Sequence, residues 1–241
     1  MEDFLPLPAS SHNFRGNLQM ARVIFDLDGT LVDSASSLAE AANALLREFD
    51  RPPLTHSTIV GFVGNGMAKL VERVLCASGG IPAFGLDHSI FRFKQIYFSD
   101  PVTGTRAYPG VTEALSCLSQ DGHGLAVCTQ KPNSPSVTIL KELELMPPIA
   151  GLTSGDSLDV IKPDPAMLWH AAEQLPEGKV IFVGDSEVDA ATAHAAGVPF
   201  LLHRNGYCHV PHESLPADAI FDRYDELPAL VQGLLEQQEF S

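Results

Sequence analysis

The sequence predicts an α/β protein in which a parallel sheet is flanked by helices and a second, all-helical unit is inserted. Three observations carry this prediction. Short apolar, β-branched runs alternate with amphipathic stretches from about residue 106 onward, residues 34 to 105 keep helical spacing throughout, and acidic or polar residues directly follow several of the apolar runs. Strands that alternate with helices form parallel sheets with right-handed crossovers.

The first strand is predicted at Val23–Phe25, and the pattern changes to that of a helix from Ser34. Asp33 or Ser34 can cap this helix, and Arg51-Pro52-Pro53 ends it. A flexible connector, GFVGNG, precedes a second helix, and a third helix follows the glycine pair GG. The apolar stripes of these three helices are Leu38, Ala41, Ala42, Leu45 and Phe49; Met67, Leu70, Val71, Val74 and Leu75; and Ile90, Phe93 and Tyr97.

The second half of the chain resumes the alternation of strands and helices. Strands are predicted at Leu125–Cys128, Ile149–Leu152, Val180–Val183 and, as the last strand, Pro199–Leu202. Helices are predicted from Val111 to Gly122 and at Ser136–Leu145, Pro165–Leu175, Val188–Ala196 and Glu226–Gln238. The predicted domains are therefore a loose tail (1–20), an α/β core (21–33 and 106–241) and the helical insertion (34–105). Met20 could be the natural start, which would make Met1–Gln19 dispensable.

Composition excludes several classes of protein. A formal net charge of -15 repels nucleic acids and anionic membranes, so neither is an expected partner. No apolar run is long enough to span a bilayer, and the first residues lack a signal-peptide core. Four widely spaced cysteines indicate free thiols in the cytoplasm rather than a disulfide framework or a zinc site. The oligomeric state, monomer or homodimer, stays open.

Two acidic residues, Asp26 and Asp28, directly follow the first strand in the stretch RVIFDLDGTLVDS. Two carboxylates so close repel each other unless a cation or a shared proton lies between them. The pair therefore indicates a divalent metal, a protonated carboxyl group, or both. Transfer of a phosphoryl group from an anionic substrate would use both.

Three further polar motifs follow later strands or loops. One strand is followed by Thr129-Gln130-Lys131-Pro132, and the loop VIKPDP contains Lys162. In the stretch VIFVGDSEVD, Asp185 follows the apolar run and Asp189 is the last residue. Ligands of parallel sheets bind beyond the carboxyl ends of the strands, where all of these residues are expected.

These four motifs, in this order, resemble those of the haloacid dehalogenase-like (HAD) phosphatase superfamily. The resemblance implies a Rossmann-like core and Mg²⁺ as cofactor. It makes Asp26 the nucleophile that becomes an aspartyl-phosphate and Asp28 the acid and base. Thr129 and Gln130 would hold the phosphate, although many relatives have Asn at the second position. Lys162 would offset negative charge, with Lys131 ranked second. The metal ligands would be Asp26, the Asp28 backbone carbonyl, Asp185 and, as support, Asp189.

The helical insertion resembles the cap of the superfamily's helical-cap branch. GFVGNGMAKLVERVL, YPGV and SGDSLDVIKPDP are most similar to bacterial phosphoglycolate phosphatases. This resemblance implies a small anionic phosphomonoester as substrate, 2-phosphoglycolate, and glycolate and phosphate as products. Asn65, Gly66 and Lys69 are candidates for binding the substrate carboxylate, and Arg106 is another.

Three alternatives stay open. A β-phosphoglucomutase-like enzyme would return the phosphoryl group to a sugar, and a phosphonatase-like enzyme would need a cap lysine, for which Lys69 is nearest. A non-catalytic phosphoacceptor module would also gather Asp residues at strand ends, but it has no use for Asp28 as a proton carrier.

Near the end of the sequence, the segment HRNGYCHVPHE contains His203, Cys208, His209 and His212. Their spacing fits no common zinc site.

Overall fold

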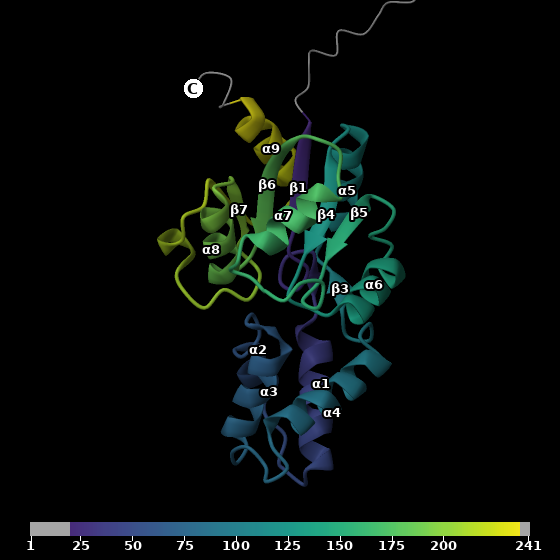
Figure 1. The fold of residues 1–241 in the computed structure, drawn as a ribbon, viewed down its shortest axis with the longest axis vertical. Coiled ribbons are helices and arrows are strands. Elements are labelled where there is room, and N and C mark those ends of the chain that lie inside the picture. Colours follow the sequence, from purple (N-terminus) through teal and green to yellow (C-terminus); the bar gives the residue numbers. More distant parts are fainter. Residues whose placement is uncertain (1–19, 237–241) are drawn as a thin grey trace, which may run out of the picture.

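A computed structural model describes residues 20–236, and its centre is a six-stranded parallel sheet (Figure 1). The strands are β1 (Ala21–Phe25), β4 (Gly124–Cys128), β5 (Ile149–Thr153), β6 (Lys179–Gly184), β7 (Phe200–His203) and β8 (Ala219–Phe221). Their spatial order is β5-β4-β1-β6-β7-β8. If the strands of this sheet alone are counted along the chain, the order is 3-2-1-4-5-6, which is that of a doubly wound Rossmann fold.

The first strand lies in the middle of the sheet. Ile24 pairs with Ala126 of β4 on one side and with Phe182 of β6 on the other. The chain builds outward from β1 to β4 and β5, and then crosses to build β6, β7 and β8 on the opposite side. The carboxyl ends of β4, β1 and β6 therefore meet where the winding direction reverses, the usual place for a ligand site in such sheets.

Alternation along β1 assigns its side chains to two apolar cores. Val23 and Phe25 pack with α5 (Val111–Gln120), α6 (Asn133–Glu142) and α9 (Leu227–Glu236). Ile24 packs on the other face with α7 (Ala166–Glu173) and α8 (Glu187–Ala196). Because both faces are covered, the strands are mostly apolar, with polar residues near their ends such as Arg22 and Lys179, as expected for a parallel sheet.

Helices α1 (Ala35–Glu48), α2 (His56–Val60), α3 (Gly66–Ala77) and α4 (Leu86–Ser99) pack around a third core of their own. We call them the helical unit; Figure 1 shows it at one end of the molecule, below the sheet. A short antiparallel pair, β2 (Val32–Asp33) and β3 (Arg106–Ala107), lies where the chain enters and leaves this unit.

The predicted fold class is confirmed, and the predicted strands and long helices lie within a few residues of the observed ones. The expectation that Pro199–Leu202 is the last strand was wrong, because the short strand β8 pairs with β7. Helix α2 was also missed: it has five residues, too few for a periodic pattern, and begins where the Thr55 side chain accepts a hydrogen bond from the Thr58 N–H.

Other details complete the fold. Two 3₁₀ helices span His212–Ser214 and Tyr224–Glu226. The predicted tail Met1–Gln19 and the end of the helix predicted to reach Gln238 lie outside the described residues. Within residues 20–236, no helix has both the length and the apolar character needed to cross a membrane.

Candidate active site

The loop after β1 begins the site. The Asp26 N–H donates to the Val183 carbonyl oxygen (2.9 Å), which continues the pairing of β1 with β6 by one residue. Gly29 has a φ of +89°, and a Cβ at this position would lie 2.3 Å from Asp185 Oδ2. Glycine is required here for two reasons, a left-handed backbone and the close approach of a carboxylate. The local sequence DLDG thus brings the ends of β1 and β6 together.

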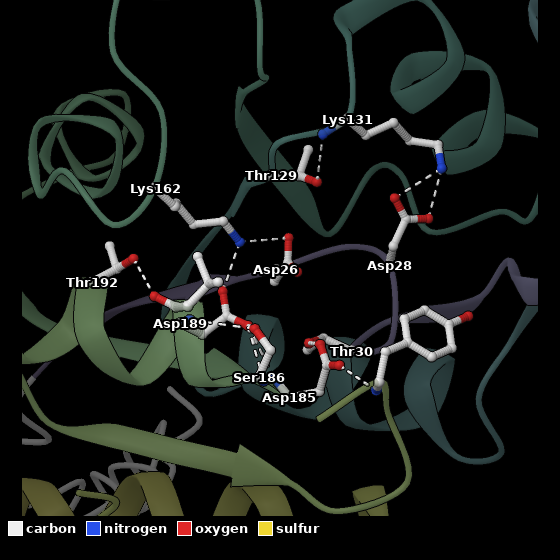
Figure 2. Close-up of polar contacts among 12 residues, drawn as sticks. Asp26, Asp28, Thr30, Thr129, Lys131, Lys162, Asp185, Ser186, Asp189 and Thr192 are labelled. Atoms are coloured by element: carbon white, nitrogen blue, oxygen red, sulfur yellow. Dashed lines mark hydrogen bonds and ion pairs between the residues drawn. The ribbon is translucent and has the colours of Figure 1, made fainter. Parts of the chain in front are cut away.

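Lys162 joins two acidic residues from different elements, Asp26 after β1 and Asp189 in α8. Its Nζ lies 2.9 Å from Asp26 Oδ1 and 2.6 Å from Asp189 Oδ1, and its side chain is only 2% exposed (Figure 2). Burial alone would lower the pKa of Lys162, but Asp189 and Asp26 raise it above its usual value, so the ammonium stays charged. Burial raises the pKa of Asp26 to about 6, against the opposing effect of Lys162.

Asp185 lies beside this group, and the backbone at Gly29 and Gly206 packs closely against its side chain. Its carboxylate accepts hydrogen bonds from Thr30 Oγ1 (2.8 Å) and from the Tyr207 N–H (2.7 Å). A Cβ on Gly206 would lie 2.3 Å from its side chain, so a larger residue would displace the carboxylate. Burial, followed by the charges of Asp189 and Asp26, raises the pKa of Asp185 well above its usual range.

Asp189 has two tasks. It is the third residue of α8 and forms a capping box with Ser186, which explains why an acidic residue opens this helix. Its Oδ2 accepts from Ser186 Oγ (2.7 Å), while Oδ1 binds Lys162. The carboxylate is therefore oriented from both sides.

Asp26, Asp185 and Asp189 each offer a carboxylate oxygen within 4.8 Å of the others, and they form the one such group of acidic, His or Cys residues in the part of the chain that the structure describes. Asp26 Oδ1 is buried without a well-oriented hydrogen-bond donor, although Lys162 Nζ is close. A buried oxygen without a well-oriented donor, in a group of three close carboxylates, is what a hard divalent cation would satisfy, so the residues present fit a metal of the Mg²⁺ type.

The Asp28 carboxylate points elsewhere, toward the helical unit. It accepts a hydrogen bond from Ser34 Oγ (2.5 Å) and binds Lys131 Nζ through both oxygens, at 2.6 and 2.9 Å (Figure 2). Lys131 was ranked below Lys162 from the sequence, but each lysine serves a different carboxylate of the pair. The motif TQKP was the only sequence signal for Lys131, and nothing marked Ser34 as a partner of Asp28.

Thr129 directly follows β4 and lies beside these groups. Its N–H donates to the Thr153 carbonyl oxygen (2.9 Å), and its Oγ1 accepts from the Lys131 N–H (3.2 Å). The hydroxyl hydrogen thus remains available to a phosphate oxygen. Sequence reasoning missed two further contacts at the site: the hydroxyl of Thr30 on Asp185, and the backbone of Tyr207.

The site residues line a cavity between the sheet and the helical unit. The helical unit supplies mostly apolar side chains and two glycines to it. The lining consists of Asp26, Asp28, Thr129, Gln130, Lys131, Lys162, Asp185 and Ser186 from the core, and Leu38, Val63, Gly64, Gly66, Met67 and Leu70 from the helical unit. The predicted nucleophile Asp26, the predicted acid Asp28, the predicted phosphate ligands and the predicted metal ligand Asp185 therefore share one cavity. Asp189 is not in its lining and reaches the site through Lys162.

The residues predicted to bind the substrate carboxylate do not all lie at the cavity. Gly66 lines the cavity, and a Cβ there would lie 3.5 Å from Gln130 Oε1. Asn65 and Lys69 are not among the lining residues. Lys69 is half exposed and pairs with Glu72 (2.7 Å) on the surface of α3, and Arg106 is exposed. Of the histidines in the segment HRNGYCHVPHE, His203 is hydrogen-bonded to the Gly29 carbonyl oxygen and His209 to the Glu187 carboxylate.

The chain is similar to known proteins over most of its length. Residues 23–203 match the family model of the haloacid dehalogenase-like hydrolases. A phosphoglycolate phosphatase of Cereibacter sphaeroides is 44% identical over 90% of this chain and 100% of its own length, and one of Rhodospirillum rubrum is 41% identical over 85% and 88%. A crystal structure described as a predicted phosphoglycolate phosphatase of Haemophilus somnus superposes with a TM-score of 0.81, at 28% identity, over 90% of this chain and 100% of that one.

The match covers β1 to β7 and therefore includes the four motifs and the helical unit. The resemblance stated from the sequence is confirmed, and the chain belongs to the haloacid dehalogenase-like hydrolase family.

Proposed function

We propose that this protein is a Mg²⁺-dependent phosphomonoesterase that hydrolyses 2-phosphoglycolate to glycolate and phosphate. The observation that carries the chemistry is the division of the two neighbouring carboxylates: Asp26 is bound to Lys162 and Asp28 to Lys131. One carboxylate can thus attack phosphorus while the other, held apart from it, handles protons. The substrate rests on the names of the relatives that are 36–44% identical to this chain.

In the first half-reaction, an Asp26 oxygen attacks phosphorus and the bond from phosphorus to the ester oxygen breaks. Asp28 gives its proton to that oxygen, which leaves as an alcohol. In the second half-reaction, Asp28 takes a proton from water as the water oxygen attacks the aspartyl-phosphate. Phosphate departs, and the Asp26 carboxylate is regenerated.

The surrounding residues stabilise the charge on the phosphoryl group. Thr129 Oγ and the Lys162 ammonium are donors at the cavity wall, in surroundings where water is scarce and electrostatic effects are strong. Mg²⁺, held by Asp26, Asp185 and the Asp28 backbone carbonyl with Asp189 in support, would add positive charge at the phosphoryl oxygens when bound.

We further propose that residues 34–105 act as a cap and residues 21–33 and 106–241 as the catalytic core, in the cytoplasm. The support for a cap is that Leu38, Val63, Met67 and Leu70 form an apolar wall opposite the charged residues. Such a wall excludes water from the reacting groups once the substrate is bound.

The test is phosphate release from a panel of small phosphomonoesters, with and without Mg²⁺. We expect 2-phosphoglycolate to have the highest kcat/KM and chelation to stop turnover reversibly. Isomerisation of a sugar phosphate without net phosphate release would contradict the proposal. So would a stable phosphorylated protein that never releases phosphate.

A further inference from the structure

The cavity has two cations among the residues that the structure describes, and they lie on opposite sides of the carboxylate pair. Lys162 faces Asp26 and Asp189, where the phosphoryl group would react. Lys131 faces Asp28, the residue assigned to the leaving oxygen. A substrate whose phosphorus lies at Asp26 and whose ester oxygen lies at Asp28 must therefore extend toward Lys131.

Lys131 is built into this position. Its side chain is 1% exposed, its N–H donates to Thr129 Oγ1 (3.2 Å), and its Nζ lies 4.9 Å from the centre of the Tyr97 ring on α4. The ion pair with Asp28 and the contact with the Tyr97 ring thus hold the Lys131 ammonium group between the core and the helical unit.

Among the described residues that line the cavity, Lys131 is the cation on the Asp28 side; Thr129, Gln130 and Ser186 offer only neutral donors there. The lining contributed by the helical unit is apolar apart from two glycines, and Lys69 and Arg106 lie outside it. A substrate carboxylate buried against Leu38, Val63 or Met67 without a partner would be strongly disfavoured. Lysine has three donors, so Lys131 can keep one hydrogen bond to Asp28 and give another to a second carboxylate.

We propose that Lys131 is the residue that determines specificity for substrates carrying a carboxylate one carbon beyond the ester oxygen, by sharing its ammonium group between that carboxylate and Asp28. This inference rests on the proposed function and extends it to the recognition of the leaving group. It reassigns carboxylate recognition from Lys69 on the surface of α3 to a buried lysine at the end of β4.

The experiment compares two esters of equal length, 2-phosphoglycolate and 2-hydroxyethyl phosphate. The first ends in a carboxylate, and the second has a neutral CH₂OH group in its place. We expect the wild-type protein to prefer the carboxylate ester in kcat/KM by roughly 10- to 100-fold, the range for one hydrogen bond to a charged group. Lys131→Met should reduce this preference to below about threefold, whereas Lys131→Arg should keep most of it. Lys69→Met is the matched surface control and should leave the preference unchanged.

Because Lys131 also contacts Asp28, the Met variant is expected to slow both esters, and the ratio between them is the readout. A second readout needs no turnover. In the Asp26→Asn background, with Mg²⁺, calorimetry should give a lower Kd for 2-phosphoglycolate than for 2-hydroxyethyl phosphate, and adding Lys131→Met should remove the difference. Circular dichroism checks that each variant is folded.

The outcomes separate this inference from the proposed function. An equal fall for both esters in Lys131→Met would overturn the role in recognition and leave the phosphatase intact, as would a loss of preference in Lys69→Met. Hydrolysis of neither ester by the wild type would overturn the proposed function, while the calorimetric difference would still test Lys131. Equal wild-type rates on both esters would overturn the inference.

Discussion

The carboxyl edge of the sheet and the helical unit face the same cavity but are built on different principles. At the sheet, buried charges are paired and oriented by hydrogen bonds, as in the group Asp26, Lys162 and Asp189. The helical unit presents apolar side chains packed on its own separate core. The sheet edge therefore holds charged groups in one fixed geometry, whereas the helical unit contributes an apolar surface that fits over them.

Besides the contacts of Asp28 with Ser34 and of Lys131 with Tyr97, links made by Tyr207 and His209 join the two regions. The chain enters the helical unit at Asp33 and Ser34, which we call the hinge. Here the Tyr207 hydroxyl donates to Asp33 Oδ1 (2.8 Å) and accepts from the Ser34 N–H (2.9 Å), while the Tyr207 N–H donates to Asp185. Away from the hinge, His209 Nε2 lies 3.2 Å from the Gly61 carbonyl oxygen, at the turn that carries Gly64 and Gly66. Mutations at the sheet edge should therefore affect chemistry, and those at the links should affect closure.

The largest effect is expected from Asp26→Asn, which removes the attacking oxygen but keeps the side-chain volume. Loss of a nucleophile that acts within a catalytic unit lowers kcat by about 10⁴-fold or more. Phosphate release at saturating substrate measures this loss, with thermal unfolding as the control for folding. Residual activity above about 1% would mean that another group attacks phosphorus.

Lys162→Met should come second and should affect stability as well as rate. It leaves Asp26 and Asp189 buried without their shared cation, and breaking a buried ion pair from one side costs about 3–5 kcal/mol. We expect a lower free energy of unfolding in urea and at least a 100-fold lower kcat. Lys69→Met, whose pair with Glu72 is partly exposed, should change neither by a measurable amount. If the two variants behave alike, the contrast between buried and surface charge is wrong.

A third effect concerns pH in the metal-free protein. Burial raises the pKa of Asp26 from 3.8 to about 6, so the folded state binds this proton more tightly than the unfolded state does. The contribution of Asp26 to stability is therefore favourable at low pH and is lost as pH rises from about 4 to about 6, by roughly 3 kcal/mol. Urea unfolding in chelator across this range should show a steeper loss in the wild type than in Asp26→Asn. Parallel curves would contradict the raised pKa.

The smallest effect is expected at the link between the two regions. His209→Ala removes the contact with Gly61 and with Glu187 without touching the carboxylates of the site. We expect KM to rise by about three- to tenfold, the size of one modest hydrogen bond, with kcat changed less than twofold. His209→Gln, which can still donate to Gly61, should recover part of the loss. A large fall in kcat with KM unchanged would show that His209 serves the chemistry instead.

The class of fold and most of the reacting groups could be predicted from the sequence. Alternating apolar runs and amphipathic stretches specify a parallel sheet, and such a sheet collects the residues after its strands at one edge, so Asp26, Thr129, Lys162 and Asp185 could be predicted to meet. Short elements such as α2 and β8 could not be predicted, because three to five residues carry too little periodicity and depend on neighbours far along the chain.

The pairing of each lysine with its carboxylate could not be predicted from the sequence, because it depends on how the strands are arranged in space. Lys131 and Asp28 are 103 positions apart, and Thr30 and Asp185 are 155 apart; these pairs exist because β1 lies between β4 and β6. The same holds for Tyr207, whose backbone orients Asp185 and whose hydroxyl reaches the hinge. Residue types and spacing identify groups able to react, but the order of the strands determines which of them come within hydrogen-bonding distance.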